Sequence, residues 1–166
     1  MAIDFDPDTF MTQTVDEPLE SERTLIPPGE YRMYIDDFNR DAFETFEFTY
    51  KRGALAGQEG KMHKFTCPIV VDDEEVKKAM GMERPKIYYQ CTLDFDENGQ
   101  LVTGPNRNID LGKLRHAVGQ NQPGPWAISQ LRGAGPFMAK VEHREGKRKD
   151  GSRFKIAEIV RFAPIR

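Results

Sequence analysis

The sequence predicts a β-rich α+β domain, a small barrel-like sheet of five to six strands with two or three short inserted helices. Three observations support this class. Apolar and polar residues alternate over several short segments, clusters of glycine and proline separate those segments, and only a few stretches show helical spacing. A chain of 166 residues is long enough for one domain with a real core, without disulfide or metal support.

The charge is unevenly distributed along the chain. Residues 1–50 carry 3 basic and 13 acidic residues, residues 51–131 carry 11 and 10, and residues 132–166 carry 10 and 4, which sums to the net charge of −3. Residues 1–24 mix acidic residues, threonine and proline with isolated apolar residues and show no sustained hydrophobic periodicity. We therefore expect a flexible acidic arm over 1–24 and a single domain over 25–166, whose basic end suits a polyanion.

Strand-like alternation begins at residues 30–36, directly after the breaker Pro27-Pro28-Gly29. Further strands are expected over 46–51 and 61–71, on either side of a glycine-spaced loop, and over 87–95. Asn98-Gly99 has the residues of a tight hairpin turn, so we expect the chain to return as a strand over 100–103.

Helical signals occur in three places. Residues 72–81 begin with an aspartate cap and end in glycine. Leu111, Leu114 and Val118 mark one helical face over 108–119, with Asn108 or Asp110 as the cap. Residues 125–131 can form one or two turns after a proline.

The chain is predicted to end in a hairpin over residues 136–163. Phe137 and Val141 on its first strand, and Phe154 and Ile156 on its second, are expected to face the core. The loop over 145–152 contains three consecutive basic residues and is expected to project. The phenylalanines expected in the core are Phe46, Phe48, Phe95, Phe137, Phe154 and Phe162.

The sequence favours a soluble protein of the cytoplasm. No apolar run approaches the length of a membrane span, and the first residues have no basic and apolar regions of a secretory signal. Cys67 and Cys91 form neither a disulfide framework nor a ligand pair, and we expect both to be free thiols.

Catalytic and metal-binding interpretations receive little support. The three histidines are scattered, and the chain has no nucleophile elbow or phosphate-binding loop. A zinc site would have to draw its ligands from unrelated elements, and the carboxylates that might hold a catalytic metal already have capping, turn or surface roles. We therefore expect no enzyme activity, no catalytic or metal-binding residue and no cofactor. The residues weighed were His63, Cys67, Cys91, His116, Asp72–Glu75, Asp94 and Asp110.

Nucleic-acid binding is the better-supported interpretation. Single strands are held by cations along the phosphates and by aromatic faces on which bases stack. This chain places both on predicted strands, opposite their apolar faces, and in the basic hairpin. The predicted nucleic-acid-binding residues are Arg32, Tyr34, Tyr50, Lys51, Arg52, Lys64, Tyr88, Trp126, Lys140, Arg144, Lys147, Arg148, Lys149, Arg153 and Lys155.

The order of several motifs resembles small phage-encoded single-stranded DNA-binding proteins of replication and recombination modules, which have an oligonucleotide/oligosaccharide-binding (OB) fold. The likeness covers about residues 26–164, through turn and packing patterns. It implies an OB-like barrel that coats single-stranded DNA in the host cytoplasm, and it leaves the oligomeric state open. The motifs are Pro27–Tyr31, Leu111–Gln120, Leu131–Gly133, Lys140–Arg144, Asp150-Gly151 and Ile159–Pro164.

The resemblance has one departure. Many such proteins end in an acidic tail that contacts replication partners, whereas this chain ends in Arg161–Arg166. The acidic N-terminal arm is a candidate for that role. The alternative is a protein-interaction module, for example a phage factor that binds or inhibits a host enzyme through the arm.

Overall fold

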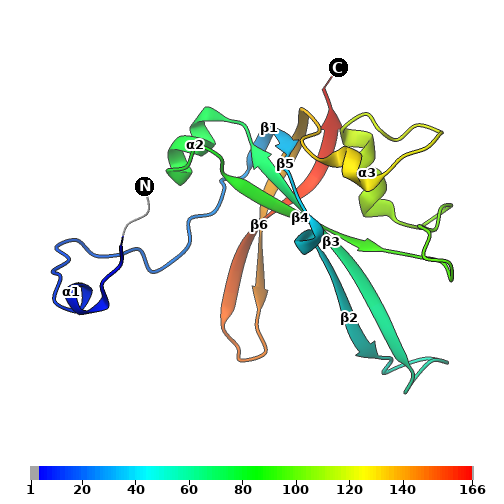
Figure 1. The fold of residues 1–166 in the computed structure, drawn as a ribbon, viewed down its shortest axis with the longest axis horizontal. Helices are drawn as coiled ribbons and strands as arrows, with labels where there is room; N and C mark the ends of the chain where they lie inside the picture. Colours follow the sequence, from blue (N-terminus) through cyan, green and yellow to red (C-terminus); the bar gives the residue numbers. More distant parts are fainter. Residues whose placement is uncertain (1–3, 166) are drawn as a thin grey trace.

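The computed structural model describes residues 4–165, which form a six-stranded antiparallel sheet with three short α-helices (Figure 1). This confirms the predicted β-rich class. The elements are α1 (Pro7–Met11), β1 (Gly29–Ile35), η1 (Arg40–Ala42), β2 (Phe43–Thr49), β3 (Glu59–Val71), α2 (Glu74–Met80), β4 (Lys86–Leu93), α3 (Ile109–Ala117), η2 (Ile128–Leu131), β5 (Phe137–Lys147) and β6 (Arg153–Pro164).

The sheet is built around the long strand β3. β1 and β2 follow one another along one edge of β3, with Ile35 paired to Ile69 and Phe43 to Phe65, while β4 pairs along the other edge. β5 pairs with β1, and β6 pairs with β5, so the hydrogen-bonded order is β2-β3-β1-β5-β6 with β4 branching from β3.

The expected barrel is not closed. β4 and β6 come near each other, with the rings of Tyr89 and Phe162 4.8 Å apart, but no strand ladder joins these two strands in the described part of the chain. α3 lies beside both strands and covers the inner side of this gap (Figure 1). The sheet is therefore curved and open between β4 and β6.

The core lies on the concave side of the sheet and follows the predicted alternation. Met33 and Ile35 of β1 and Phe65 of β3 are completely buried, and Leu114 of α3 packs into the same cluster. Each such side chain contributes about 1.5–3 kcal/mol by leaving water. Helix α2 begins and ends as predicted: Asp73 accepts a hydrogen bond from the Val76 N–H, and Gly81 closes α2 with φ = 64°.

Several phenylalanines predicted for the core are not buried. Phe46 and Phe95 are 44% and 39% exposed, and only Phe137 of the six is completely buried. Phe46 lies on the edge strand β2, whose residues are nearly all exposed. Phe48, Phe154 and Phe162 are half-buried.

The prediction for the second strand of the final hairpin was wrong at its outer half. The β5–β6 register shifts at Lys140/Val141, because β6 inserts Val160 as an extra residue. Beyond this bulge Phe154 and Ile156 pair with Gly146 and Arg144, on the face opposite Val141. These two side chains therefore extend the outer side of the hairpin instead of the core.

Two turn predictions also change. The Asn98-Gly99 turn forms, but the returning strand is reduced to a single bridge between Phe95 and Leu101. Asn108 does not cap α3 with its side chain. Instead, its amide bonds the backbone of Asp94 and Val102 and holds this turn against the helix.

The prediction for the two cysteines is confirmed. Cys67 and Cys91 are free and buried, and burial raises the pKa of the Cys91 thiol to about 12. Residues 4–24 are all exposed and contain only the short helix α1. Among the described residues, no helix combines the length and apolar character needed to cross a membrane.

Candidate nucleic-acid interface

The side of the sheet opposite the core gathers many of the predicted binding residues. We call this side the outer face. Because side chains alternate along a strand, Arg32 and Tyr34 point away from the core strand positions Met33 and Ile35. The pairings Tyr34–Val70, Pro68–Tyr88, Thr66–Gln90 and Lys64–Thr92 place the polar positions of β1, β3 and β4 on this same face.

The outer face carries Tyr34 and Tyr88 on either side of β3, paired with Val70 and Pro68, and Lys64 four residues before Pro68 along β3. Tyr88 is 59% exposed, and Tyr34 and Lys64 are half-buried. The pairing of Phe46 with Met62 puts the Phe46 ring on the outer face as well, and the Lys64 ammonium lies 5.5 Å from the center of that ring. The face therefore offers exposed aromatic rings beside a cation, which is the combination that single-stranded nucleic acid requires.

Sequence reasoning missed three residues of this face: Phe46, Arg84 and Lys86. Lys86 could have been found, because it stands two positions before Tyr88 on the same strand face. Arg84 precedes β4 in a loop, so no alternation pointed to it.

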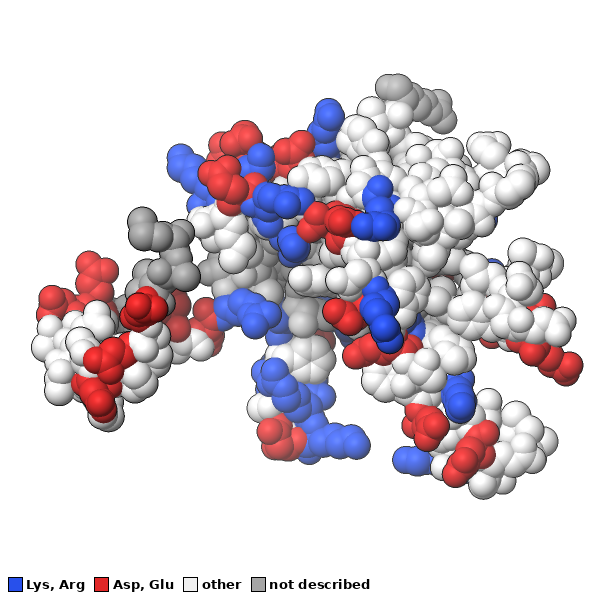
Figure 2. Space-filling view, viewed as in Figure 1, with Lys and Arg blue, Asp and Glu red and all other residues white. Residues whose placement is uncertain are grey.

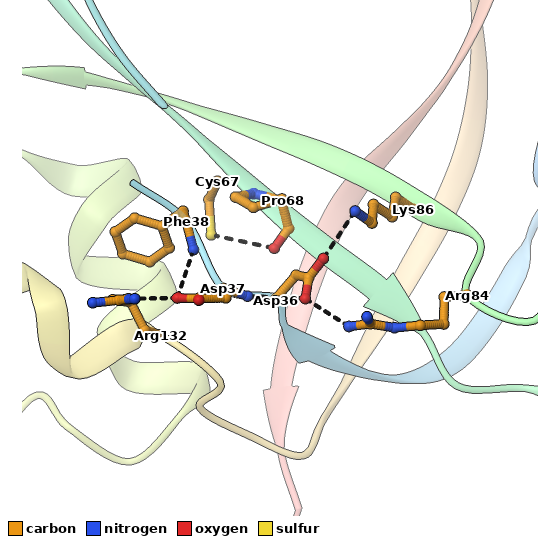
Figure 3. Close-up of polar contacts among 8 residues, drawn as sticks. All are labelled: Asp36, Asp37, Phe38, Cys67, Pro68, Arg84, Lys86 and Arg132. Carbon is orange, nitrogen blue, oxygen red and sulfur yellow. Dashed lines mark hydrogen bonds and ion pairs between the residues drawn. The ribbon is translucent and has the colours of Figure 1, made fainter. Parts of the chain in front are cut away.

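The two basic residues hold the end of β1 in place (Figure 3). The Arg84 guanidinium and the Lys86 ammonium donate to opposite oxygens of Asp36, at 2.6 and 2.9 Å. Burial acts to raise the pKa of Asp36, but hydrogen bonds from Lys86, the Asp37 backbone and Arg84 outweigh it and lower that pKa. The neighbouring Asp37 accepts from Arg132, which ties the same corner to the segment after η2 (Figure 3).

Much of the positive charge on the outer face is already balanced by carboxylates. Arg32 lies 3.8 Å from Asp72, and Lys140 lies 3.2 Å from Glu142. On the hairpin, Arg144 contacts Glu158 at 3.2 Å. These exposed pairs contribute little to stability.

The hairpins β2–β3 and β5–β6 project in the same general direction from the sheet (Figure 1). Tyr50, Lys51 and Arg52 lie directly after β2, at the start of the loop that connects β2 to β3. The tip of the second is basic, and Figure 2 shows its Lys and Arg side chains together at the lower end, with the acidic arm to the left. Among residues 4–165, no carboxylate lies within 4.0 Å of the charged nitrogens of Lys147, Lys149, Arg153 and Lys155.

The basic residues of the β5–β6 hairpin do not share one face. Lys140 and Arg144 lie on the outer face, with Arg161 and Ile156 as their cross-strand partners. Lys147 pairs with Arg153 and Lys155 with Glu145, on the opposite side. Arg148 and Lys149 form the turn, where Arg148 lies 5.5 Å over the Phe154 ring and bonds Ser152 and the Arg153 carbonyl.

Trp126 also lies apart from the outer face. Its ring is half-buried against the core cluster, and the Arg115 guanidinium covers it at 4.0 Å. Its indole N–H donates to Gln120 at 2.9 Å. These contacts give Trp126 a packing role beside α3, so we leave it out of the proposed interface.

A cavity of about 380 Å³ lies between β4, α3 and β6. It is lined by Tyr89, Asp110, Lys113, His116, Ile159, Val160, Arg161 and Phe162. Tyr89 donates to Asp110 at 3.3 Å, and burial together with the nearby Asp110 charge raises the pKa of Tyr89. Within residues 4–165 no three His, Cys, Asp or Glu side chains converge as metal ligands.

Comparison with protein-family models, curated proteins and solved structures gives no match to this chain. The functional proposal therefore rests on the fold and on the geometry of the outer face.

Proposed function

We propose that this protein is an OB-like domain that binds single-stranded DNA without sequence preference, as a binding protein and not an enzyme. The observation that carries the proposal is the outer face, which presents Tyr34, Lys64 and Tyr88 on three neighbouring strands of a sheet from which two hairpins project. The proposed role is to protect single strands during DNA replication or recombination, in the cytoplasm of a phage-infected cell, and it needs no cofactor.

The order of the strands supports the OB-like part of the proposal. If β1 and β2 are counted as one bent strand, the chain has five strands, and the helix α3 falls between the third and the fourth. Around the sheet the bent strand β1–β2 pairs with β3, β3 with β4, β6 with β5, and β5 with β1, which gives the order 1-2-3-5-4-1. The third and fifth strands, β4 and β6, approach each other without a ladder. This order matches the order expected for the partly open five-stranded Greek-key barrel of OB domains and so supports the proposal.

The same strand count assigns the tips of the two hairpins to loops that bind ligands in OB domains. OB domains bind oligonucleotides on the face of the second and third strands and on the loops between strands 1 and 2 and between strands 4 and 5. Here the corresponding face belongs to β3 and β4 and carries Lys64 and Tyr88. The corresponding loops are the tips of the β2–β3 and β5–β6 hairpins, which hold Lys51, Arg52 and the Lys147–Lys149 turn.

A direct binding measurement tests the proposal. Fluorescence anisotropy of labelled oligo-dT should rise on titration with the protein, and the logarithm of the binding constant should fall with the logarithm of salt by about 0.7 for each neutralised phosphate. The label belongs on the DNA, because Trp126 lies apart from the outer face. Absence of binding at low salt would refute the proposal.

Tyr88 provides a matched pair of variants for the stacking step. Tyr88→Ala should weaken binding by about 1–3 kcal/mol, the usual worth of one stacked base, whereas Tyr88→Phe should keep most of the affinity because it keeps the ring. Tyr88 is exposed, so neither change should disturb the fold. Equal affinities of the two variants would show that no base stacks on this residue.

The alternative function is a protein-interaction module, and the arm favours it. Phe5, Phe10 and Met11 at α1 are 70%, 57% and 74% exposed, and acidic residues surround them. An acidic segment with exposed apolar side chains suits a partner groove with a basic rim. If oligo-dT does not bind, a partner that recognises residues 4–24 becomes the leading interpretation.

A further inference from the structure

The edge strand β2 has one side with which no other strand of residues 4–165 pairs. It pairs with β3 along one side only, and nearly all of its residues are exposed. Proteins usually protect such an edge with proline, lysine, a bulge or a covering element. Residues 43–49, with the sequence FETFEFT, contain no proline or lysine, and the β2–β3 ladder has no register shift.

The free backbone groups of this edge can be assigned. The Tyr50 N–H donates to the Gln58 carbonyl and the Gly57 N–H donates to the Tyr50 carbonyl, so Tyr50 directs its backbone groups toward β3. Because antiparallel ladders alternate, Glu44, Phe46 and Phe48 do the same. The backbone N–H and C=O groups of Thr45, Glu47 and Thr49 then point to the unpaired edge.

We propose that β2 pairs antiparallel with β2 of a second copy of this chain, with Phe46 on the two-fold axis. This register matches Thr45 with Glu47 of the second copy, so that the outward backbone groups of both strands bond each other. It also matches Glu44 with Phe48, and it brings the two Phe46 rings together as a close cross-strand pair.

The charges of β2 favour this register over its neighbour. With Phe46 on the axis, no two like charges lie opposite each other, whereas moving the axis to Glu47 would oppose two glutamates. Within one chain Glu44 is paired across the ladder with Lys64, and Glu47 with Lys61. These lysines offset the glutamates along the edge and reduce the repulsion between the two copies.

The length of β2 limits the strength of the contact. Seven residues extend about 24 Å, and an edge-to-edge contact of that length buries less than the roughly 1,200 Å² of a standard stable interface. We therefore expect a reversible dimer that forms as concentration rises. Its two-fold axis is perpendicular to the sheet, because both Phe46 side chains lie on one side. The outer faces of the two copies then join into one surface.

Sedimentation equilibrium without DNA tests this proposal, so its outcome is independent of the proposed function. The natural chain should shift from 19.0 kDa toward twice that mass with rising concentration. Phe46→Lys alone and Phe46→Glu alone should each stay monomeric, because like charges would meet on the axis. An equimolar mixture of the two should regain the dimer.

Phe95→Lys is the matched control, since Phe95 is similarly exposed at 39% but lies outside β2. It should dimerise as the natural chain does. A natural chain that stays monomeric at every concentration would overturn the proposal. So would a mixture that does not dimerise, or a Phe95→Lys variant that loses the dimer as Phe46→Lys does. Circular dichroism should show the natural fold for all variants, as expected for exposed positions.

Discussion

Replacing Lys147 and Lys149 by alanine tests whether the basic tip of the β5–β6 hairpin contacts phosphates. Neither ammonium has a carboxylate within 4.0 Å among the described residues, so neither charge has to leave an ion pair to bind DNA. If each lysine neutralises one phosphate, each contributes about 0.7 to the salt slope on a single strand, and the double variant should lose about 1.4. Arg148 stays in place because it supports the turn through Ser152 and Phe154.

The assay is the titration of labelled oligo-dT over a series of salt concentrations. Lys78→Ala combined with Lys113→Ala removes the same net charge from α2 and α3, outside the hairpins and the outer face. This control should change the affinity slightly and leave the slope almost unchanged. If the hairpin variant keeps the natural slope, the two lysines contact no phosphate. If the control flattens the slope equally, the hairpin acts only through the overall charge of the protein.

Two further predictions concern the corner of β1 and the acidic arm. Asp36→Asn should lower the free energy of unfolding at neutral pH by about 1.5–3 kcal/mol. The change removes the charge of a carboxylate that is only 12% exposed and that accepts charged hydrogen bonds from Arg84 and Lys86. The folded protein lowers the pKa of Asp36 below 3.8, so this stabilisation is present above that value and is lost as the pH falls through the folded pKa. Urea unfolding should therefore show the two proteins converging in strong acid, and a difference that persists there would contradict the assignment. Removing residues 1–22 should tighten oligo-dT binding at low salt, because these residues are acidic and contain no lysine or arginine. High salt should erase the gain in affinity. An affinity equal to that of the full chain would show that the arm does not compete with DNA.

Most of the strands and the helices α2 and α3 were predictable because their signals are local. Alternation in 30–36 and 87–95 places Met33, Ile35 and Cys91 inside and Tyr34 and Tyr88 outside, and the structure has them there. The same reasoning failed for Phe46. Alternation tells which side chains share a face of a strand, but whether another element covers that face depends on the position of the strand in the sheet.

The end of β1 at Asp36 shows a second limit of prediction from the sequence. Asp36 belongs to the predicted strand pattern, yet its partners Arg84 and Lys86 lie about fifty residues later in the chain. Pairings of that separation arise from the strand order, which the sequence alone did not determine. For the same reason Trp126 was predicted as a binding residue, although Arg115 and Gln120 from the α3 region occupy its ring and its N–H.

The bulge at Val160 has the largest effect on the interface. A regular β6 would keep Phe154 and Ile156 on the core side and would place Lys155 on the outer face beside Arg144. The inserted residue reverses the outer half of the strand, so Ile156 joins Arg144 on the outer face and Lys155 turns to the opposite side. A strand of DNA that follows Tyr88 and Lys140 along the outer face therefore meets Arg144 and then the Arg148–Lys149 turn. Contacts to Arg153 and Lys155 require it to pass around the tip of the hairpin.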